Sequence, residues 1–144
     1  MCIRDRIEGL ARLDPRIQGI VAHAQFTGNP NVEADLDALA SRPLVKGVRH
    51  NIQGNPTGWA LQESFVQGIQ AAHRRGFHFE LCLTHDQLEE SIELVRRCRE
   101  VSFVLDHCAK PNITECQKEP WLTHMREMAQ LLSLIHISEP TRPY

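Results

Sequence analysis

The segment Phe103–Pro111 places an acid, an imidazole and a lysine directly after a short apolar run. The run is rich in branched and aromatic residues and is closed by proline, which predicts a buried strand that ends near Asp106. Polar groups at the carboxyl end of such a strand lie where α/β proteins bind ligands. There His107 could ligate a divalent metal, bind a carbonyl group or transfer a proton. The alternative is a histidine whose nitrogens are satisfied by loop carbonyls.

Two neighbours of His107 are candidates for supporting roles. Successive side chains of an extended strand point to opposite faces, so Asp106 is predicted to support the site from behind or to anchor the loop. Lys110 could reach an anionic substrate, or it could remain a solvated lysine before Pro111. His107 is therefore the candidate catalytic residue of this segment, and Lys110 a candidate substrate-binding residue.

Arg49 ends a second apolar run, within Gly47–Gln53, where an unpaired guanidinium would be costly to bury. The planar fork of arginine suits a carboxylate. That carboxylate could belong to a substrate or to Glu80, which lies in the alternating stretch 77–83. The alternation predicts a polar inner face and an apolar face that packs on helices. Glu80 is then either a general base or the buried partner of Arg49.

The elements that would position these residues alternate regularly along the chain. Each strand-like run is followed by a helical pattern, and one of these patterns begins with the capping-box sequence Thr84-His-Asp-Gln87. This rhythm predicts βαβ units and a parallel sheet, as part of a (β/α)8 barrel or as a small doubly wound domain. The predicted strands are 19–24, 44–50, 77–83 and 102–107, and the predicted helices are 32–39, 61–72, 84–95 and 121–131.

Composition excludes several classes of function. The net charge is −2 and no basic stripe is present, which argues against nucleic acid or an anionic membrane as a partner. No apolar run approaches the roughly 18 residues of a membrane-spanning helix. The five cysteines form no C-x-x-C motif and two of them lie in apolar runs, so a reducing cytoplasm is the expected location.

The two ends of the chain differ from the rest. Met1–Arg6 resembles the translation of one end of a transposase sequencing adapter, and residues 132–142 resemble the translation of its opposite strand. We therefore expect residues 1–6 and 132–144 to be non-native and residues 7–131 to be the native segment. The native segment would be an internal part of a longer protein.

The native segment resembles the amidohydrolase-related family, and most closely its lactonase branch, which includes fuconolactone and pyrone-dicarboxylate lactonases. The segments that carry the resemblance are Gly47–Gln53, residues 65–83, Phe103–Pro111 and the Glu119-Pro-Trp121 sequence. The resemblance implies a fragment of a (β/α)8 TIM barrel that covers about strands three to six.

The resemblance also implies a reaction, in which an activated water attacks the carbonyl of a lactone. His107 matches the catalytic histidine of the family and Arg49 its substrate-binding arginine, while His50 and Gln53 are placed to contact substrate hydroxyls. The family's H-x-H pair, and the aspartate that is expected to act as its base, lie outside this chain. Some pyrone-dicarboxylate lactonases have a second arginine where this chain has Asn55, so a neutral or singly charged sugar lactone is favoured.

Further expectations follow from what the segment contains. A divalent metal such as zinc is compatible with His107, but none is required by the residues present. A metal-dependent nonoxidative decarboxylase of the same superfamily is the second enzymatic interpretation, and a non-catalytic doubly wound binding domain is the third. The expected partner is a small lactone or carboxylate. Because the H-x-H pair and the aspartate are missing, we expect the 144-residue polypeptide itself to be inactive.

Overall fold

The computed structural model describes residues 3–131 and 134–137, which form one parallel sheet with helices between its strands. The strands are β1 (Ile20–His23), β2 (Val45–Arg49), β3 (His78–Leu81), β4 (Phe103–Asp106) and β5 (Leu134–Ile137). The helices are α1 (Ile3–Ala11), α2 (Val32–Ala40), α3 (Glu63–His73), α4 (Leu88–Arg97) and α5 (Trp121–Met128), with short 3-10 turns η1 (Trp59–Leu61), η2 (His85–Gln87) and η3 (His107–Ala109).

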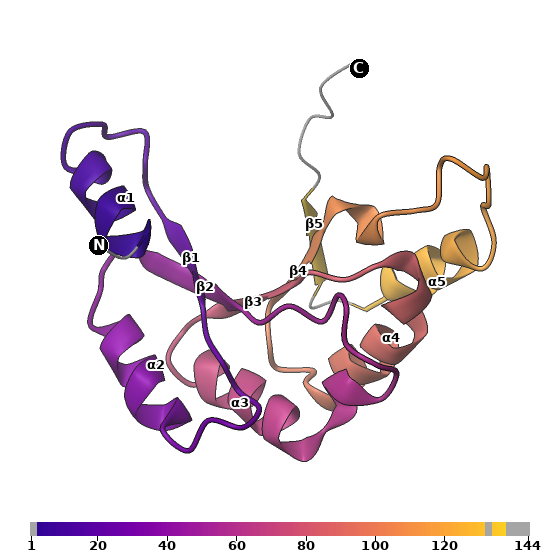
Figure 1. Ribbon diagram of the computed structural model, residues 1–144, viewed down its shortest axis with the longest axis horizontal. Helices are drawn as coiled ribbons and strands as arrows, with labels where there is room; N and C mark the ends of the chain where they lie inside the picture. Colours follow the sequence, from indigo (N-terminus) through magenta and orange to yellow (C-terminus); the bar gives the residue numbers. More distant parts are fainter. Residues whose placement is uncertain (1–2, 132–133, 138–144) are drawn as a thin grey trace.

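The order of the strands distinguishes the two architectures that the sequence left open. The order in space is β1-β2-β3-β4-β5, the same as along the chain, and every pair is parallel. Helices α2 to α5 cover one face of the sheet (Figure 1). A doubly wound sheet would reverse its strand order at a switch point and carry helices on both faces. The predicted fragment of a TIM barrel is therefore confirmed, and the doubly wound alternative is wrong.

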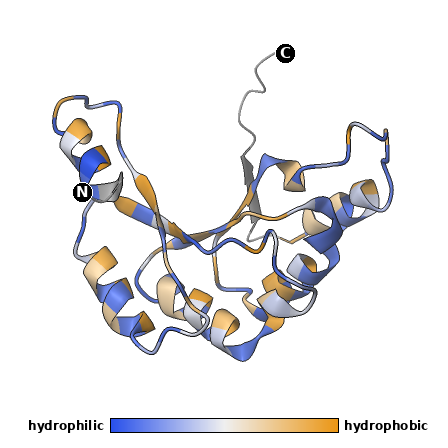
Figure 2. Cartoon of the chain, viewed as in Figure 1, coloured by the Kyte–Doolittle hydropathy of each residue, from blue (hydrophilic) through white to orange (hydrophobic). Residues whose placement is uncertain are grey.

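The core lies between the sheet and helices α2 to α5. Alternate strand residues point toward the helices and are completely buried, including Val48, Phe79 and Leu105. The inner sides of α3 and α4 supply further apolar side chains at helical spacing, such as Phe65, Ile69 and Ile92. In Figure 2 hydrophobic residues follow the central strands, and the helices alternate between hydrophobic and hydrophilic stretches. This one-sided core leaves the opposite face of the sheet for polar side chains.

The predicted capping box is present at the start of the α4 region. The backbone N–H of Thr84 donates to Oε1 of Gln87 over 3.3 Å, and the two residues form the reciprocal pattern expected from the sequence. The predicted helix therefore begins where the sequence placed it, with a short 3-10 turn before α4.

The structure has one more strand than the sequence predicted. Strand β5 lies within residues 132–144, which were set aside as adapter-derived, and α1 begins within residues 1–6, which were set aside for the same reason. The register of β5 along β4 runs from Phe103↔Leu134 to Asp106↔Ile137. A strand edge presents unpaired backbone groups that a short β-prone segment can pair with, whatever its origin. The foreign origin of both ends stays a prediction, and residues 1–2, 132–133 and 138–144 lie outside the described residues.

Gly68 of α3 is required by a close approach. A Cβ at this position would overlap the ring of Phe26, which is buried and packs against Phe65 and Phe79 with ring centroids 5.8 and 5.9 Å away. We expect Gly68→Ala to lower the free energy of unfolding by about 1–2 kcal/mol, because overpacking outweighs the better helix propensity of alanine. Urea denaturation measures the change.

Gly9 of α1 provides the matched control, because a Cβ there meets no atom within 4 Å. Gly9→Ala should be neutral or stabilising by up to about 1 kcal/mol. Equal effects of the two substitutions would contradict the packing argument.

Candidate active site

The carboxyl ends of β2, β3 and β4 bring charged side chains together on the face of the sheet opposite the helices. Arg49 is paired in register with Glu80, and Asp106 follows on the next strand. Nη1 of Arg49 lies 2.9 Å from Oδ2 of Asp106 and 3.5 Å from Oε2 of Glu80. The carboxylates that pair with Arg49 therefore belong to the protein itself, and there are two of them, those of Asp106 and Glu80. Asp106, expected to anchor the loop, is the nearer partner.

The charges in this triad (Arg49, Glu80 and Asp106) stabilise one another. Burial alone would lower the pKa of Arg49, but the hydrogen bond with Asp106 and the charges of Glu80 and Asp106 outweigh it and raise the pKa above its usual value. The side chains of Asp106 and Glu80 are only 12% and 17% exposed. Since carboxylates so poorly hydrated need a cation, Arg49 holds both in place.

His107 begins a left-handed turn at the end of β4. The φ angles of four consecutive residues, His107, Cys108, Ala109 and Lys110, are 52°, 51°, 58° and 48°. None of them is glycine, so each residue is in a conformation that L-amino acids adopt only at a cost. The turn leaves the His107 side chain exposed and buries Ala109 completely. His107 is therefore accessible, directly after a strand that ends at Asp106 as the sequence predicted.

Lys110 and Gln53, both predicted to bind substrate, are brought together and bind each other. Nζ of Lys110 donates to Oε1 of Gln53 over 2.6 Å and lies 3.5 Å from both Sγ of Cys82 and the carbonyl oxygen of Leu83. The backbone of Gln53 is also fixed, because its N–H donates to the carbonyl of Cys82 over 3.0 Å. Lys110 thus links the loops that follow β2, β3 and β4.

The His50 ring is fixed by a hydrogen bond at Nδ1 and by contacts with neighbouring rings. Its Nδ1 accepts the backbone N–H of Phe26 over 3.1 Å, and its ring centroid lies 5.0 Å from that of Trp59 and 5.4 Å from that of His23. Burial, with a smaller contribution from His23, lowers the pKa of His50 to about 4. His50 is therefore neutral at pH 7, and a substrate hydroxyl would have to use Nε2.

Gln87 and Glu90, from the α4 region, hold the loop after β2. Sequence reasoning identified Gln87 only as a capping residue and missed this role for both. Nε2 of Gln87 donates to the carbonyls of Ile52 and Asn55 over 3.0 and 3.1 Å. The carboxylate of Glu90 accepts the N–H groups of Gly58 and Ala60 over 2.7 and 2.6 Å. No local pattern distinguishes Glu90 from the neighbouring acids of α4, so the sequence held no signal for this role.

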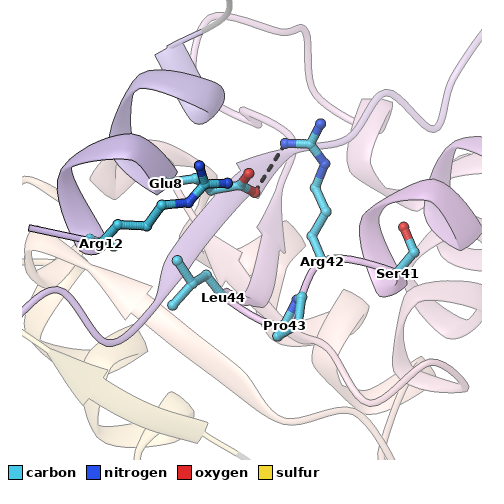
Figure 3. A pocket seen from close by; sticks show the side chains of 7 residues that line it. Glu8, Arg12, Ser41, Arg42, Pro43 and Leu44 are labelled. Atoms are coloured by element: carbon cyan, nitrogen blue, oxygen red, sulfur yellow. Dashed lines mark hydrogen bonds and ion pairs between the residues drawn. The ribbon is translucent and has the colours of Figure 1, made fainter. Parts of the chain in front are cut away.

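Two cavities lie outside the triad. One, of about 290 Å³, lies between α1 and the connection from α2 to β2, at the opposite edge of the sheet, where Arg42 bonds Glu8 over 3.0 Å (Figure 3). A second, of about 360 Å³, is lined by the loop after β4 and by Trp121. The first is separate from the strand ends that carry the triad and His107.

The described residues do not form a metal site by themselves. Within residues 3–131 and 134–137 no group of three or more His, Cys, Asp or Glu side chains is arranged to hold an ion. His107 projects from the edge of the sheet without such companions.

A sequence profile of the amidohydrolase family matches residues 5–138, and the chain belongs to this family. It is 29% identical over 97 residues to an L-fucono-1,5-lactonase of Burkholderia ambifaria, covering 67% of this chain and 33% of that protein. It is also 29% identical over 133 residues to the uncharacterized protein y4mH of Sinorhizobium fredii, covering 86% of this chain and 44% of that protein.

Solved structures show the same fold. The chain is similar to a zinc-bound amidohydrolase from Burkholderia multivorans, with a TM-score of 0.81, 21% identity, and coverage of 92% of this chain and 48% of that one. It is also similar to a probable 2-pyrone-4,6-dicarboxylic acid hydrolase from Acinetobacter baumannii with citric acid bound, with a TM-score of 0.62, 18% identity, and coverage of 94% and 48%. The chain thus spans less than half the length of these relatives. No helix in the described part of the chain is long and apolar enough to cross a bilayer.

The lowered pKa of His50 predicts a dependence of stability on pH. Its usual value is 6.5, against about 4 in the folded protein. As pH falls from about 6.5 toward 4, the unfolded chain takes up a proton that the folded chain excludes, so the free energy of unfolding falls. Urea midpoints at pH 7 and pH 5 should show this loss. His50→Asn retains an oxygen that can accept the Phe26 N–H but cannot titrate, and it should reduce the change in the free energy of unfolding between pH 7 and pH 5. Burial also lowers the pKa of His78, so the contribution of His78 to this change should remain. A change as large as in the unmodified chain would contradict the lowered pKa of His50.

The triad predicts a large effect of removing its cation. Arg49→Met would leave the carboxylates of Asp106 and Glu80 close together without a counter-charge, and we expect the free energy of unfolding to fall by about 1–3 kcal/mol. Arg74→Met is the matched control, because Arg74 is 61% exposed and lies 3.4 Å from Glu33. The control should change stability by less than about 0.5 kcal/mol. Chemical denaturation of both variants measures the difference. Similar losses of free energy of unfolding would show that Arg49 does not stabilise the two carboxylates more than an exposed ion pair does.

Proposed function

We propose that the chain is the part of an amidohydrolase barrel that contributes about strands three to six, and that the whole protein opens a lactone of a sugar acid or related carboxylate. The observation that carries this proposal is the triad of Arg49, Glu80 and Asp106 at the carboxyl ends of adjacent strands, with the exposed His107 directly after Asp106. Ligands of barrel enzymes bind at this edge. Similarity to an L-fucono-1,5-lactonase supports lactones as the substrate class.

The reaction needs a nucleophile, a base and groups that bind the developing negative charge. The oxygen of water forms a bond to the lactone carbonyl carbon, the ring C–O bond breaks, and the proton of the water ends on the released hydroxyl group. The base would be the aspartate that the family resemblance places outside this chain. His107, exposed at the edge, would donate to the carbonyl oxygen or transfer the proton.

Arg49 would serve as the cation of the site. Two acids already fix its guanidinium, yet it carries five N–H donors and its side chain is 39% exposed. The donors that remain can bind an acidic group or a carbonyl of the substrate, while Asp106 and Glu80 set the direction of the fork. Asn55 donates to the carbonyl of Asn51 over 3.0 Å and adds no positive charge, which supports a neutral or singly charged substrate.

The proposed environment is the cytoplasm. Among the residues that the structure describes no disulfide joins the cysteines, as is usual in a reducing compartment. The small acidic net charge of −2 gives no reason to propose nucleic acid as a partner.

The test compares two proteins from the same locus. Long sequencing reads without adapters would give the gene on both sides of residues 7–131, and the protein completed in this way should hydrolyse sugar lactones in a pH-stat assay. We expect His107→Ala to lower kcat/KM by about a hundredfold or more, since proton transfer contributes that much. The 144-residue chain should show no turnover above its own His107→Ala variant.

Three outcomes would contradict the proposal. Turnover by the 144-residue chain above its His107→Ala control would show that the missing strands are not needed. Release of carbon dioxide from a carboxylated substrate, without lactone opening, would favour a nonoxidative decarboxylase. Stop codons close to residues 7 and 131 would mean a genuine small domain and would remove the reason for assigning a lactone.

A further inference from the structure

The left-handed turn of residues 107–110 needs external support. A residue other than glycine in this conformation costs roughly 1 kcal/mol or more, and here four follow one another. The hydrogen bond that closes the turn, from the N–H of Lys110 to the carbonyl of His107 at 2.9 Å, cannot by itself offset that cost. The surroundings of the turn must therefore hold it in place.

Contacts from three directions fix the turn. At its start, Asp106 is bound by Arg49 of β2 over 2.9 Å. In its middle, Nε1 of Trp121, the first residue of α5, donates to the carbonyl of Cys108 over 2.8 Å. Ala109 is completely buried, which fixes the backbone next to it.

The side chain of Lys110 holds the end of the turn through a contact with the loop after β2. Its ammonium group reaches Oε1 of Gln53 in that loop and lies beside Sγ of Cys82 and the carbonyl of Leu83, at the end of β3. A methylene stem of this length crosses from the fourth strand to the second. The ammonium group is thus engaged with three acceptors of the protein itself.

We propose that Lys110 is a positioning residue, whose ammonium group ties the left-handed turn to the loops after β2 and β3 and so fixes the place of the His107 imidazole. This inference rests on the role proposed above for His107. It replaces direct substrate binding, which the sequence suggested for Lys110, by action through a neighbouring residue. The neutral Lys110→Met retains the stem but loses all three contacts, whereas Lys110→Arg retains a donor.

The experiment uses the 144-residue chain and amide hydrogen exchange measured by NMR. Lys110→Met should accelerate exchange at the amide of residue 110, which reports the closure of the turn, by about tenfold or more, since a charged hydrogen bond is lost. The ring resonances of His107 should shift or broaden in the same variant. Lys110→Arg should restore both signals at least in part.

Lys118→Met is the control. Lys118 is an exposed lysine of the same loop, and its backbone carbonyl accepts the N–H of Leu122. Its replacement should leave the exchange of residue 110 and the His107 resonances unchanged. If Lys110→Met does not fold, Gln53→Met removes the nearest acceptor and should give a smaller acceleration at the same amide.

The outcomes separate this inference from the proposed function. Unchanged exchange and unchanged His107 resonances in Lys110→Met, or in Gln53→Met should that variant be needed, would overturn the positioning role whatever the enzyme does. In the completed protein, Lys110→Met should lower kcat about tenfold with a smaller change in KM, and a rise in KM alone would instead identify Lys110 as a substrate-binding group. If the completed protein hydrolyses no lactone, the exchange data still decide the role of Lys110 in the turn.

Discussion

The ion pairs of Arg49 with Asp106 and Glu80 join three strands at the edge where the site lies. An arginine at the end of an apolar strand must find anions, and in this fold they come from the two strands that follow along the chain. The parallel register places Arg49 beside Glu80, and the next strand brings Asp106 within 2.9 Å. Because Asp106 directly precedes His107, the same pair that satisfies the charge of Arg49 also sets the point at which the β4 turn begins.

Charged side chains have different arrangements at the carboxyl ends and at the amino ends of the strands. At the carboxyl edge, poorly exposed acids surround one arginine, and an exposed histidine stands beside them. At the other edge, Arg42 joins the connection between α2 and β2 to α1 through Asp5 and Glu8 over 2.8 and 3.0 Å. The second group links α1 to the connection that leads into β2. This division agrees with barrel proteins in general, where one edge carries chemistry and the other stability.

Local pattern predicted the elements well, because burial on one face imposes alternation on strands and a 3.6-residue period on helices. The four strands, the helices between them and the Thr84–Gln87 cap were all visible in this way. The choice between a barrel and a doubly wound sheet could not be made from local pattern, since both alternate strands and helices and differ in strand order.

Strand β5 was missed because its segment had been assigned to an adapter. That Arg49 needs an acid could be predicted from residue type, with Glu80 as one of two candidates, whereas the pair of Lys110 with Gln53 joins loops 57 residues apart. The left-handed turn has no signal either, as His, Cys, Ala and Lys do not favour it.

The agreement between strand order and chain order also bears on how this protein can fold. Each strand pairs with the one formed before it, so a growing sheet can add one strand and its covering helix at a time. Among the described strands β1 to β5, none has to wait for a partner from a distant part of the chain, as it would in a sheet whose order is permuted. The entropy of closing a loop rises slowly with its length, and here every closure spans a similar short stretch. Assembly by successive addition would keep each newly formed edge exposed until the next unit arrives, which makes the edge beyond β4 the place where pairing with the wrong segment is easiest.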